Sequence, residues 1–145
     1  MPTGERVDPY MNFNFLVEID GINQGTFQEC TGLDSTTEPV DYREGGENTT
    51  VRKLPGKSTY SDIVLKRGIT DSDELWQWRK KIVKGQVERK NGSIVLLDLE
   101  GNEKLRWNFV NAWPTKWEGP SFDAKANDVA IEALTLAHEG VEKAD

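Results

Sequence analysis

Apolar and polar residues alternate near the start of the chain, between residues 12 and 20. Four apolar side chains would share one face of an extended segment there: Phe13, Phe15, Val17 and Ile19. A period of two is typical of a strand with one buried face. The Asp20-Gly21 pair then predicts a turn. Further short strands are predicted over residues 26–30, 40–43 and 60–67.

The period becomes helical between residues 70 and 84. At 100° per residue, five apolar side chains fall within an arc of about 160°: Leu75, Trp76, Trp78, Ile82 and Val83. Thr70 or Asp71 can cap the start, and Gly85 is placed where a left-handed residue ends a helix. We therefore expect an amphipathic helix over residues 70–84, with Leu75, Trp78 and Ile82 as its core anchors.

A β-hairpin is predicted around Glu100-Gly101-Asn102, with its strands over residues 93–99 and 104–110. The Trp113-Pro114 pair predicts the end of the second strand. Residues 127–138 stay undecided, because their Ala, Leu and Glu content favours a helix while Val129 and Ile131 alternate with their neighbours. The whole pattern predicts a mostly β protein of seven or so strands with one helix.

Residues 44–58 contain three glycines and one proline, which predicts a long loop. A loop of this length in a compact domain is usually either functional or disordered. Its segment Leu54-Pro55-Gly56-Lys57-Ser58 resembles the end of a phosphate-binding loop, but that motif requires a glycine where Val51 stands. The sequence therefore favours an interaction role for this loop over a nucleotide site.

Composition narrows the class further. A chain of 145 residues predicts one domain, residues 1–145, and 36% hydrophobic residues with five Trp argue against disorder. The single cysteine, Cys30, excludes an intramolecular disulfide and a multi-cysteine zinc site. No apolar run is long enough to span a bilayer, and no signal peptide is recognisable. We expect synthesis in a reducing cytoplasm, without a cofactor, a metal or membrane insertion by the monomer.

Charge is distributed unevenly along the chain. The formal net charge is −7. Residues 1–50 contain 10 acidic and 2 basic side chains, whereas residues 51–90 contain 11 basic and 5 acidic ones. This clustering is compatible with an ordinary solvated surface. It is also compatible with oppositely charged patches that meet between copies of the chain, because such patches steer association and fix register.

Two other functional classes remain open on the residues alone. Trp113 and Trp117 bracket Pro114 and could form the platform of a carbohydrate-binding β-sandwich. A small hydrolase would have to depend on the one histidine, His138, which has no cysteine or second histidine near it in the sequence. No catalytic constellation stands out, so we expect an interaction or assembly protein rather than an enzyme.

Several blocks of residues together resemble one family. They are Arg52-Lys53-Leu54-Pro55-Gly56, Leu65-Lys66-Arg67-Gly68, Leu75-Trp76-Gln77-Trp78, Asn111-Ala112-Trp113-Pro114-Thr115-Lys116-Trp117 and Ala137-His138-Glu139-Gly140. In this order they resemble the tail tube proteins of contractile-tailed phages and of phage-tail-like contractile injection systems. The resemblance extends from about Asn12 to Gly140.

The resemblance implies a β-barrel or sandwich with one flanking helix, similar to the tube proteins of type VI secretion systems. It implies that residues 127–138 form a strand. It also implies that the loop at 44–58 is an extended hairpin that reaches neighbouring subunits. The residues expected at the subunit or ring interface are Glu44, Asn48, Arg52, Lys53, Leu54 and Lys57.

The implied function is mechanical. Hexameric rings would stack into the hollow inner tube of a virion tail or an injection particle, as a conduit for DNA or effectors. The implied partners are other copies of the chain, a sheath protein, baseplate or hub proteins and tube-terminating proteins. Because the chain is acidic overall, we also expect a net negative tube lumen, which would repel DNA rather than bind it.

Overall fold

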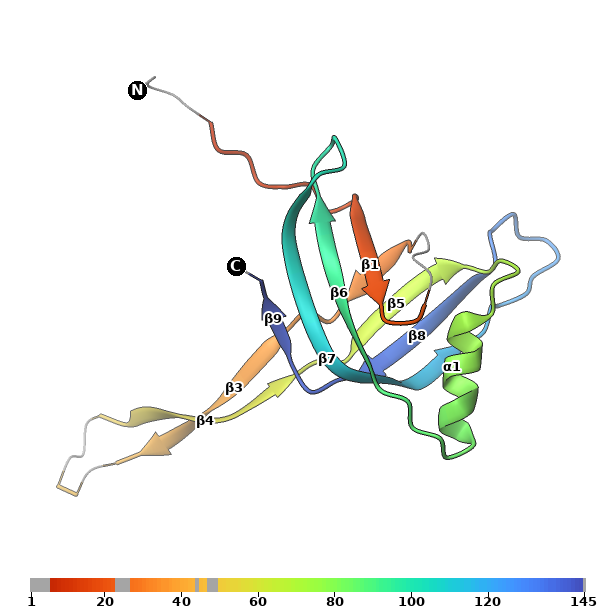
Figure 1. The fold of residues 1–145 in the computed structure, drawn as a ribbon. Coiled ribbons are helices and arrows are strands. Elements are labelled where there is room, and N and C mark those ends of the chain that lie inside the picture. Colours follow the sequence, from red (N-terminus) through yellow and green to blue (C-terminus); the bar gives the residue numbers. More distant parts are fainter. Residues whose placement is uncertain (1–5, 23–26, 44, 47–49, 145) are drawn as a thin grey trace.

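A computed structural model describes residues 6–22, 27–43, 45–46 and 50–144. These residues form nine strands and one helix (Figure 1). In chain order they are β1 (Phe15–Ile19), β2 (Glu29–Thr31), β3 (Ser35–Tyr42), β4 (Arg52–Tyr60), β5 (Ile63–Gly68), α1 (Glu74–Val83), β6 (Lys90–Leu97), β7 (Glu103–Glu118), β8 (Ile131–Ala137) and β9 (Val141–Lys143). The prediction of a mostly β protein with one helix is confirmed.

Two β layers share one long strand, β7. Its first part pairs with β6 on one side and with β9 on the other, and β6 pairs in turn with β1. Its second part pairs with β8, and the layer continues through β5 to β2. All these pairings are antiparallel. The strand β7 bends between the two layers, so that they face each other across the core (Figure 1).

The passage of β7 from one layer to the other occurs at Asn111, whose φ is 53°. This left-handed conformation is uncommon for a residue with a side chain, although Asn adopts it more readily than most residues. The backbone N–H of Asn111 donates to Oδ1 of Asn91 at 2.9 Å, and its side-chain Nδ2 donates to Oε2 of Glu139 at 2.7 Å. Beside it, Val110 and Glu139 are joined by a backbone hydrogen bond. This bend of β7, here called the corner, is therefore held by hydrogen bonds to two other segments of the chain.

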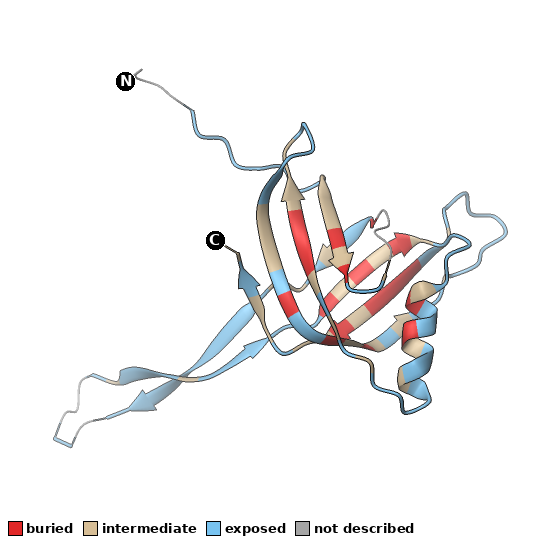
Figure 2. Cartoon of the chain, in the orientation of Figure 1, coloured by how far each residue is buried: buried red, intermediate tan, exposed pale blue. Residues whose placement is uncertain are grey.

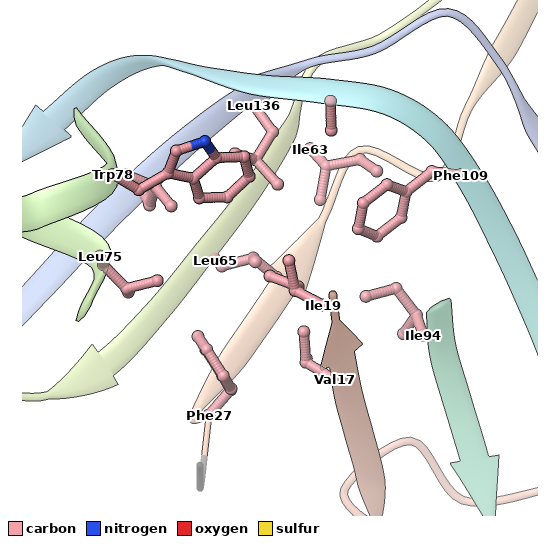
Figure 3. Packing of buried hydrophobic residues seen from close by; sticks show 12 residues of the cluster. Val17, Ile19, Phe27, Ile63, Leu65, Leu75, Trp78, Ile94, Phe109 and Leu136 are labelled. Atoms are coloured by element: carbon pink, nitrogen blue, oxygen red, sulfur yellow. The ribbon is translucent and has the colours of Figure 1, made fainter. Parts of the chain in front are cut away.

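The core lies between the layers and is built from alternate strand positions (Figure 2). One layer contributes Val17 and Ile19 of β1, Ile94 of β6 and Phe109 of β7, and the other contributes Ile63 and Leu65 of β5 with Leu134 and Leu136 of β8. Figure 3 shows the labelled side chains of both layers converging, with Phe27 at one end and Leu75 and Trp78 of α1 at another. The alternation predicted for residues 12–20 is confirmed for 15–19, whereas Phe13 lies before the strand and is exposed.

The helix α1 closes one side of the core through Leu75 and Trp78. The indole Nε1 of Trp78 donates to the carbonyl of Glu88 at 2.7 Å, so its one polar atom is satisfied. The helix ends at a left-handed Gly85, as predicted: the N–H of Gly85 donates to the carbonyl of Ile82, and that of Gln86 to the carbonyl of Lys81.

The predicted helix was wrong in its start and in part of its buried face. It begins at Glu74 rather than Thr70, and Asp73 precedes it without a capping hydrogen bond from its side chain. Trp76 and Val83 are exposed and Ile82 is half-buried. The ring of Trp76 packs instead against that of Trp117, with 4.9 Å between the centroids. The buried arc is narrower than the sequence indicates: only Leu75 and Trp78 of the helix are buried, whereas Trp76 and Arg79 contact β7 while staying partly exposed.

Two strand predictions also need correction. Residues 52–58, predicted as part of a loop, belong to β4. Trp113-Pro114 does not end a strand, since β7 continues to Glu118. Pro114 fits because the register of β7 against β8 shifts just after it, in an irregularity where a missing N–H is tolerated. The family resemblance implies a strand over 127–138, and this is confirmed only for Ile131–Ala137, which form β8; residues 127–130 are outside any strand.

Replacing Trp78 by Ala should lower the free energy of unfolding by about 3–5 kcal/mol, because it empties a large space in the core. Trp76→Ala is the matched control: Trp76 is 41% exposed and should cost much less. Urea denaturation of both variants measures the difference. Equal losses, or a wild-type melting temperature for Trp78→Ala, would show that α1 does not depend on this contact.

Replacing Asn111 separates conformational strain from hydrogen bonding at the corner. Asn111→Gly keeps the left-handed backbone and loses the bond to Glu139, at a cost of about 1 kcal/mol. Asn111→Val loses the same bond, and holding a Val in the left-handed conformation costs about 1–2 kcal/mol more. Chemical denaturation should therefore show that the Asn111→Gly protein is more stable than the Asn111→Val protein. The reverse order would contradict the role assigned to this backbone conformation.

Candidate assembly interface

The strands β3 and β4 form a two-stranded ribbon, here called the arm (residues 35–60). It projects from the two packed layers and α1, here called the body (Figure 1). They pair only with each other, from Ser35 opposite Tyr60 to Tyr42 opposite Arg52. Every residue of β3 is exposed, as is every residue of β4 except Gly56 (Figure 2). None of the arm's described residues belongs to the core cluster, so their side chains are not needed to fill the body.

The pairing register sorts the predicted interface residues onto two faces of the arm. Leu54 lies opposite Val40 and Arg52 opposite Tyr42, so these four residues share one face. Lys53 lies on the other face, opposite Asp41. Lys57 also lies in β4, beside the irregularity that separates Thr37 from Pro39 in the register. Two predicted interface residues, Glu44 and Asn48, lie outside the described residues.

The charged pair on the second face is an ion pair between two residues of the same chain. Nζ of Lys53 donates to Oδ1 of Asp41 at 2.5 Å. Both side chains are largely exposed, so solvent screens the pair and its contribution to stability is small. The hydroxyls of Thr37 and Ser58 share a hydrogen bond of 2.7 Å nearer the body. This face therefore has partners before any second copy approaches.

The arm joins the body at a tightly packed joint. Nε2 of His138 lies 2.8 Å from the carbonyl of Ser61, and Nδ1 of His138 accepts from the N–H of Gly140 at 3.2 Å. The imidazole of His138 also contacts the ring of Tyr60, at the end of β4. Gly32 lies against the carbonyl oxygen of Asp62, at 1.9 Å from where a Cβ would stand. Any side chain there would displace the base of the arm.

His138, the one histidine in the chain, has a structural role at this joint. Both ring nitrogens of His138 face main-chain groups that bond them, which is the environment of a structural histidine. Cys30 is half-buried, and burial raises the pKa of its thiol to about 11, so it is a poor nucleophile at neutral pH. Among the described residues, no group of three or more His, Cys, Asp or Glu side chains could hold a metal ion.

The tryptophans proposed as a carbohydrate platform are not both presented to solvent. Trp117 packs against the core and against Trp76, and its Nε1 is buried. Trp113 is half-buried in β7. The segment that resembles a phosphate-binding loop lies in β4, where its backbone amides face a strand rather than the start of a helix.

Part of the charge segregation seen in the sequence is neutralised within the chain. Glu29 and Asp41 of the acidic first third lie beside Lys66 and Lys53 of the basic segment. Arg106 bridges two acids of different elements: Nη1 donates to Glu18 at 2.8 Å and Nη2 to Glu103 at 2.6 Å. Similarly, Glu88 accepts from Lys81 and Lys90.

The hydrogen bonds in these clusters shift the pKa of the acids. Hydrogen bonding to Arg106 lowers the pKa of Glu103, and hydrogen bonds from Lys81 and Lys90 lower that of Glu88. Both groups are thus charged at neutral pH and would lose these pairs only in acid. The described surface consequently has fewer uncompensated charges than the sequence indicates.

The layers end in strands with a free hydrogen-bonding edge among the described elements. In one layer the outer strands are β1 and β9, and in the other they are β2 and the second part of β7. Of these, β2 and β9 are each only three residues long. Short edges limit unwanted pairing, yet they can still add a strand from a neighbouring chain. No described helix is long and apolar enough to cross a bilayer.

Comparisons with known proteins agree with this geometry. The chain is similar to a protein in the sheath–tube complex of the PVC extracellular contractile injection system in its extended state, with 34% identity, a TM-score of 0.85 and coverage of 94% of this chain and 91% of the other. It is similar to a chain of the tube-terminating cap of the anti-feeding prophage, with 31% identity, a TM-score of 0.85 and coverage of 98% and 97%.

More distant solved structures share the fold, among them one described as a type six secretion system protein, at 10% identity and a TM-score of 0.60. Hcp1 from Flavobacterium johnsoniae has the same fold at 16% identity, with a TM-score of 0.57 and coverage of 89% of this chain and 93% of its own. A search of curated protein sequences finds no match. A family profile described as the T4-like virus tail tube protein gp19 matches residues 11–142. The chain therefore belongs to the T4-like tail tube protein gp19 family.

Proposed function

We propose that this protein is the structural subunit of the inner tube of a contractile tail or injection particle, and that it assembles into stacked hexameric rings around a hollow channel. The observation that carries the proposal is the likeness to a protein of a solved sheath–tube complex over 94% of the chain. Both the body and the arm fall within the span that the family profile matches.

Ring closure would use the sheet edges and stacking would use the arm. Pairing of an edge strand with the next subunit satisfies the open main-chain groups and removes the exposed edge, as closed barrels do. A head-to-tail contact that closes on itself makes a ring, and a second contact of this type makes a filament. The arm, which has exposed residues on both faces, is suited to the second contact.

The proposed interface residues on the arm are Arg52, Lys53, Leu54 and Lys57, together with Glu44 and Asn48. The partners would be further copies of this chain, a sheath protein around the tube, a baseplate or hub and a tube-terminating protein. Solved assemblies containing similar proteins include a sheath–tube complex, a baseplate and a cap. DNA or effector proteins would be the cargo of the channel.

The work of such a subunit is mechanical and requires no catalysis. When the sheath contracts, the tube must move as a rigid body through a target envelope, so each subunit has to be stiff and closely joined to its neighbours. The subunit would be made in a bacterial cytoplasm and then built into a virion tail or an injection particle.

The purified protein, at high concentration or with its baseplate proteins, should form sixfold rings or tubes in negative-stain electron micrographs. Low salt should favour assembly if opposite charges meet between copies. A protein that stays monomeric under all these conditions contradicts the proposal. Retention of that monomer on a polysaccharide resin would favour the carbohydrate-binding alternative instead.

Shortening the arm should abolish tubes without unfolding the subunit. Because Thr37 and Ser58 are paired directly, residues 38–57 can be replaced by Asn-Gly, which closes a two-residue hairpin. The body loses no core residue, so its melting temperature should stay close to that of the wild type. Tubes of normal length and yield from this variant would show that the arm is dispensable for assembly.

A further inference from the structure

One charged pair lies among the apolar side chains that β5 and β8 direct toward the core. Arg67 of β5 and Glu132 of β8 are 6% and 4% exposed and lie directly opposite each other. The other core-face pairs of these two strands are apolar, namely Ile63 with Leu136 and Leu65 with Leu134. Arg and Glu are rarely buried to this extent, because taking an ionised group out of water is costly.

The buried pair is not held by hydrogen bonds. Nε of Arg67 lies 3.4 Å from Oε1 of Glu132, and neither atom has a hydrogen-bond partner among the described residues. The guanidinium of Arg67 lies over the ring of Phe27, with its carbon 5.6 Å from the ring centroid. A buried ion pair with incomplete hydrogen bonding adds little stability compared with apolar side chains of similar size. A gain in stability therefore does not account for this pair.

The pair does distinguish between alternative alignments of β5 and β8. A slip of one residue would turn every core side chain outward, so the apolar pattern itself excludes it. A slip of two residues keeps the same faces inward and only pairs each Leu or Ile with a different apolar neighbour. In one direction such a slip would place Arg67 opposite Ala130, and in the other direction opposite Leu134. In both cases Arg67 and Glu132 would be buried without each other.

We propose that Arg67 and Glu132 are positioning residues that fix the alignment of β5 with β8. Burying a charge without its partner is far more costly than burying an imperfect pair, so the native alignment is strongly favoured over both two-residue slips. Charged side chains that point inward are one means by which β proteins exclude wrong strand pairings. The inference concerns the fold of a single subunit, so it is independent of the proposed tube function.

The alignment matters because β5 begins at the base of the arm (Figure 1). Only Ser61 and Asp62 separate the end of β4 from the start of β5. At about 3.3 Å per residue, a slip of two residues would move β5 by about 7 Å along β8. Ser61 would then lose its contact with His138, which directly follows β8. The charged pair at one end of these strands thus sets the joint at their other end.

An apolar double variant, Arg67→Met with Glu132→Leu, tests this assignment. It nearly keeps the side-chain volumes and removes both charges, so its melting temperature should equal or exceed that of the wild type. The charge-reversed double variant, Arg67→Glu with Glu132→Arg, is the matched control, because it keeps an opposite-charge pair at the same two positions. The apolar variant should lose the unique alignment, whereas the charge-reversed variant should keep it.

Disulfide trapping on the outer face of the layer reports the alignment. Val64 lies opposite Thr135 in the native register, and would lie opposite Ala133 or Ala137 after a slip of two residues. Val64→Cys is therefore combined with Thr135→Cys, Ala133→Cys or Ala137→Cys in each background, and the refolded chain is oxidised mildly. Diagonal positions are about 7–8 Å apart, too far to link, so only directly opposite ones react. The native Cys30 packs against the core on the other face.

In the wild-type and charge-reversed backgrounds, the link between positions 64 and 135 should dominate. In the apolar background, the link from 64 to 133 or to 137 should rise at least about tenfold, because no buried charge opposes the slip. Non-reducing gels and peptide mass spectrometry measure these links. An apolar variant that keeps only the native link, or that unfolds, overturns the inference, and so does slippage in the charge-reversed variant. If the charge-reversed chain does not fold, the comparison of the apolar variant with the wild type decides.

Discussion

The left-handed turn of β7 at Asn111 determines how the two layers face each other. Up to Ala112, just after this residue, β7 pairs with β6, and from Trp113 onward it pairs with β8. The bond from Asn111 to Glu139 ties the corner to the segment after β8, and the backbone N–H of Val110, which donates to the carbonyl of Gly140, ties it to the segment before β9. The core and the base of the arm both depend on the placement of β8, which this corner sets.

The same corner joins two of the separated sequence blocks that carry the family resemblance. Asn111 to Trp117 supplies the turn and the second half of β7, and Ala137 to Gly140 supplies the segment bonded to it. Periodicity predicted the strand at 15–19, the hairpin of β6 and β7 and the buried pair Leu75 and Trp78, because one-sided burial leaves an alternating or helical pattern. It missed the continuation of β7, because Pro114 normally ends a strand unless a register shift accommodates it.

The sequence pattern predicts only one short strand of the arm, at 40–43, which overlaps the end of β3, and reads the part that forms β4 as an irregular loop. Gly56 and Pro55 hide that strand, and its exposure on both faces removes the burial pattern that would reveal it. The six predicted interface residues came from a family resemblance, and the structure then divides the described ones by face. Lys53 forms an ion pair with Asp41 on one face, whereas Leu54 lies opposite Val40 on the other face. Such a division follows from pairing register, which the sequence of a single strand does not contain.

An exposed two-stranded ribbon also affects when a polymer can start. A free subunit gains little from holding its arm rigid, because neither face is covered, so the first docking event bears the full entropic cost of ordering it. In the ring that we propose, several arms would be covered together and would share this cost. Growth from an existing ring would then be faster than spontaneous nucleation, and the uncovered arm would favour dispersed subunits until a template is present.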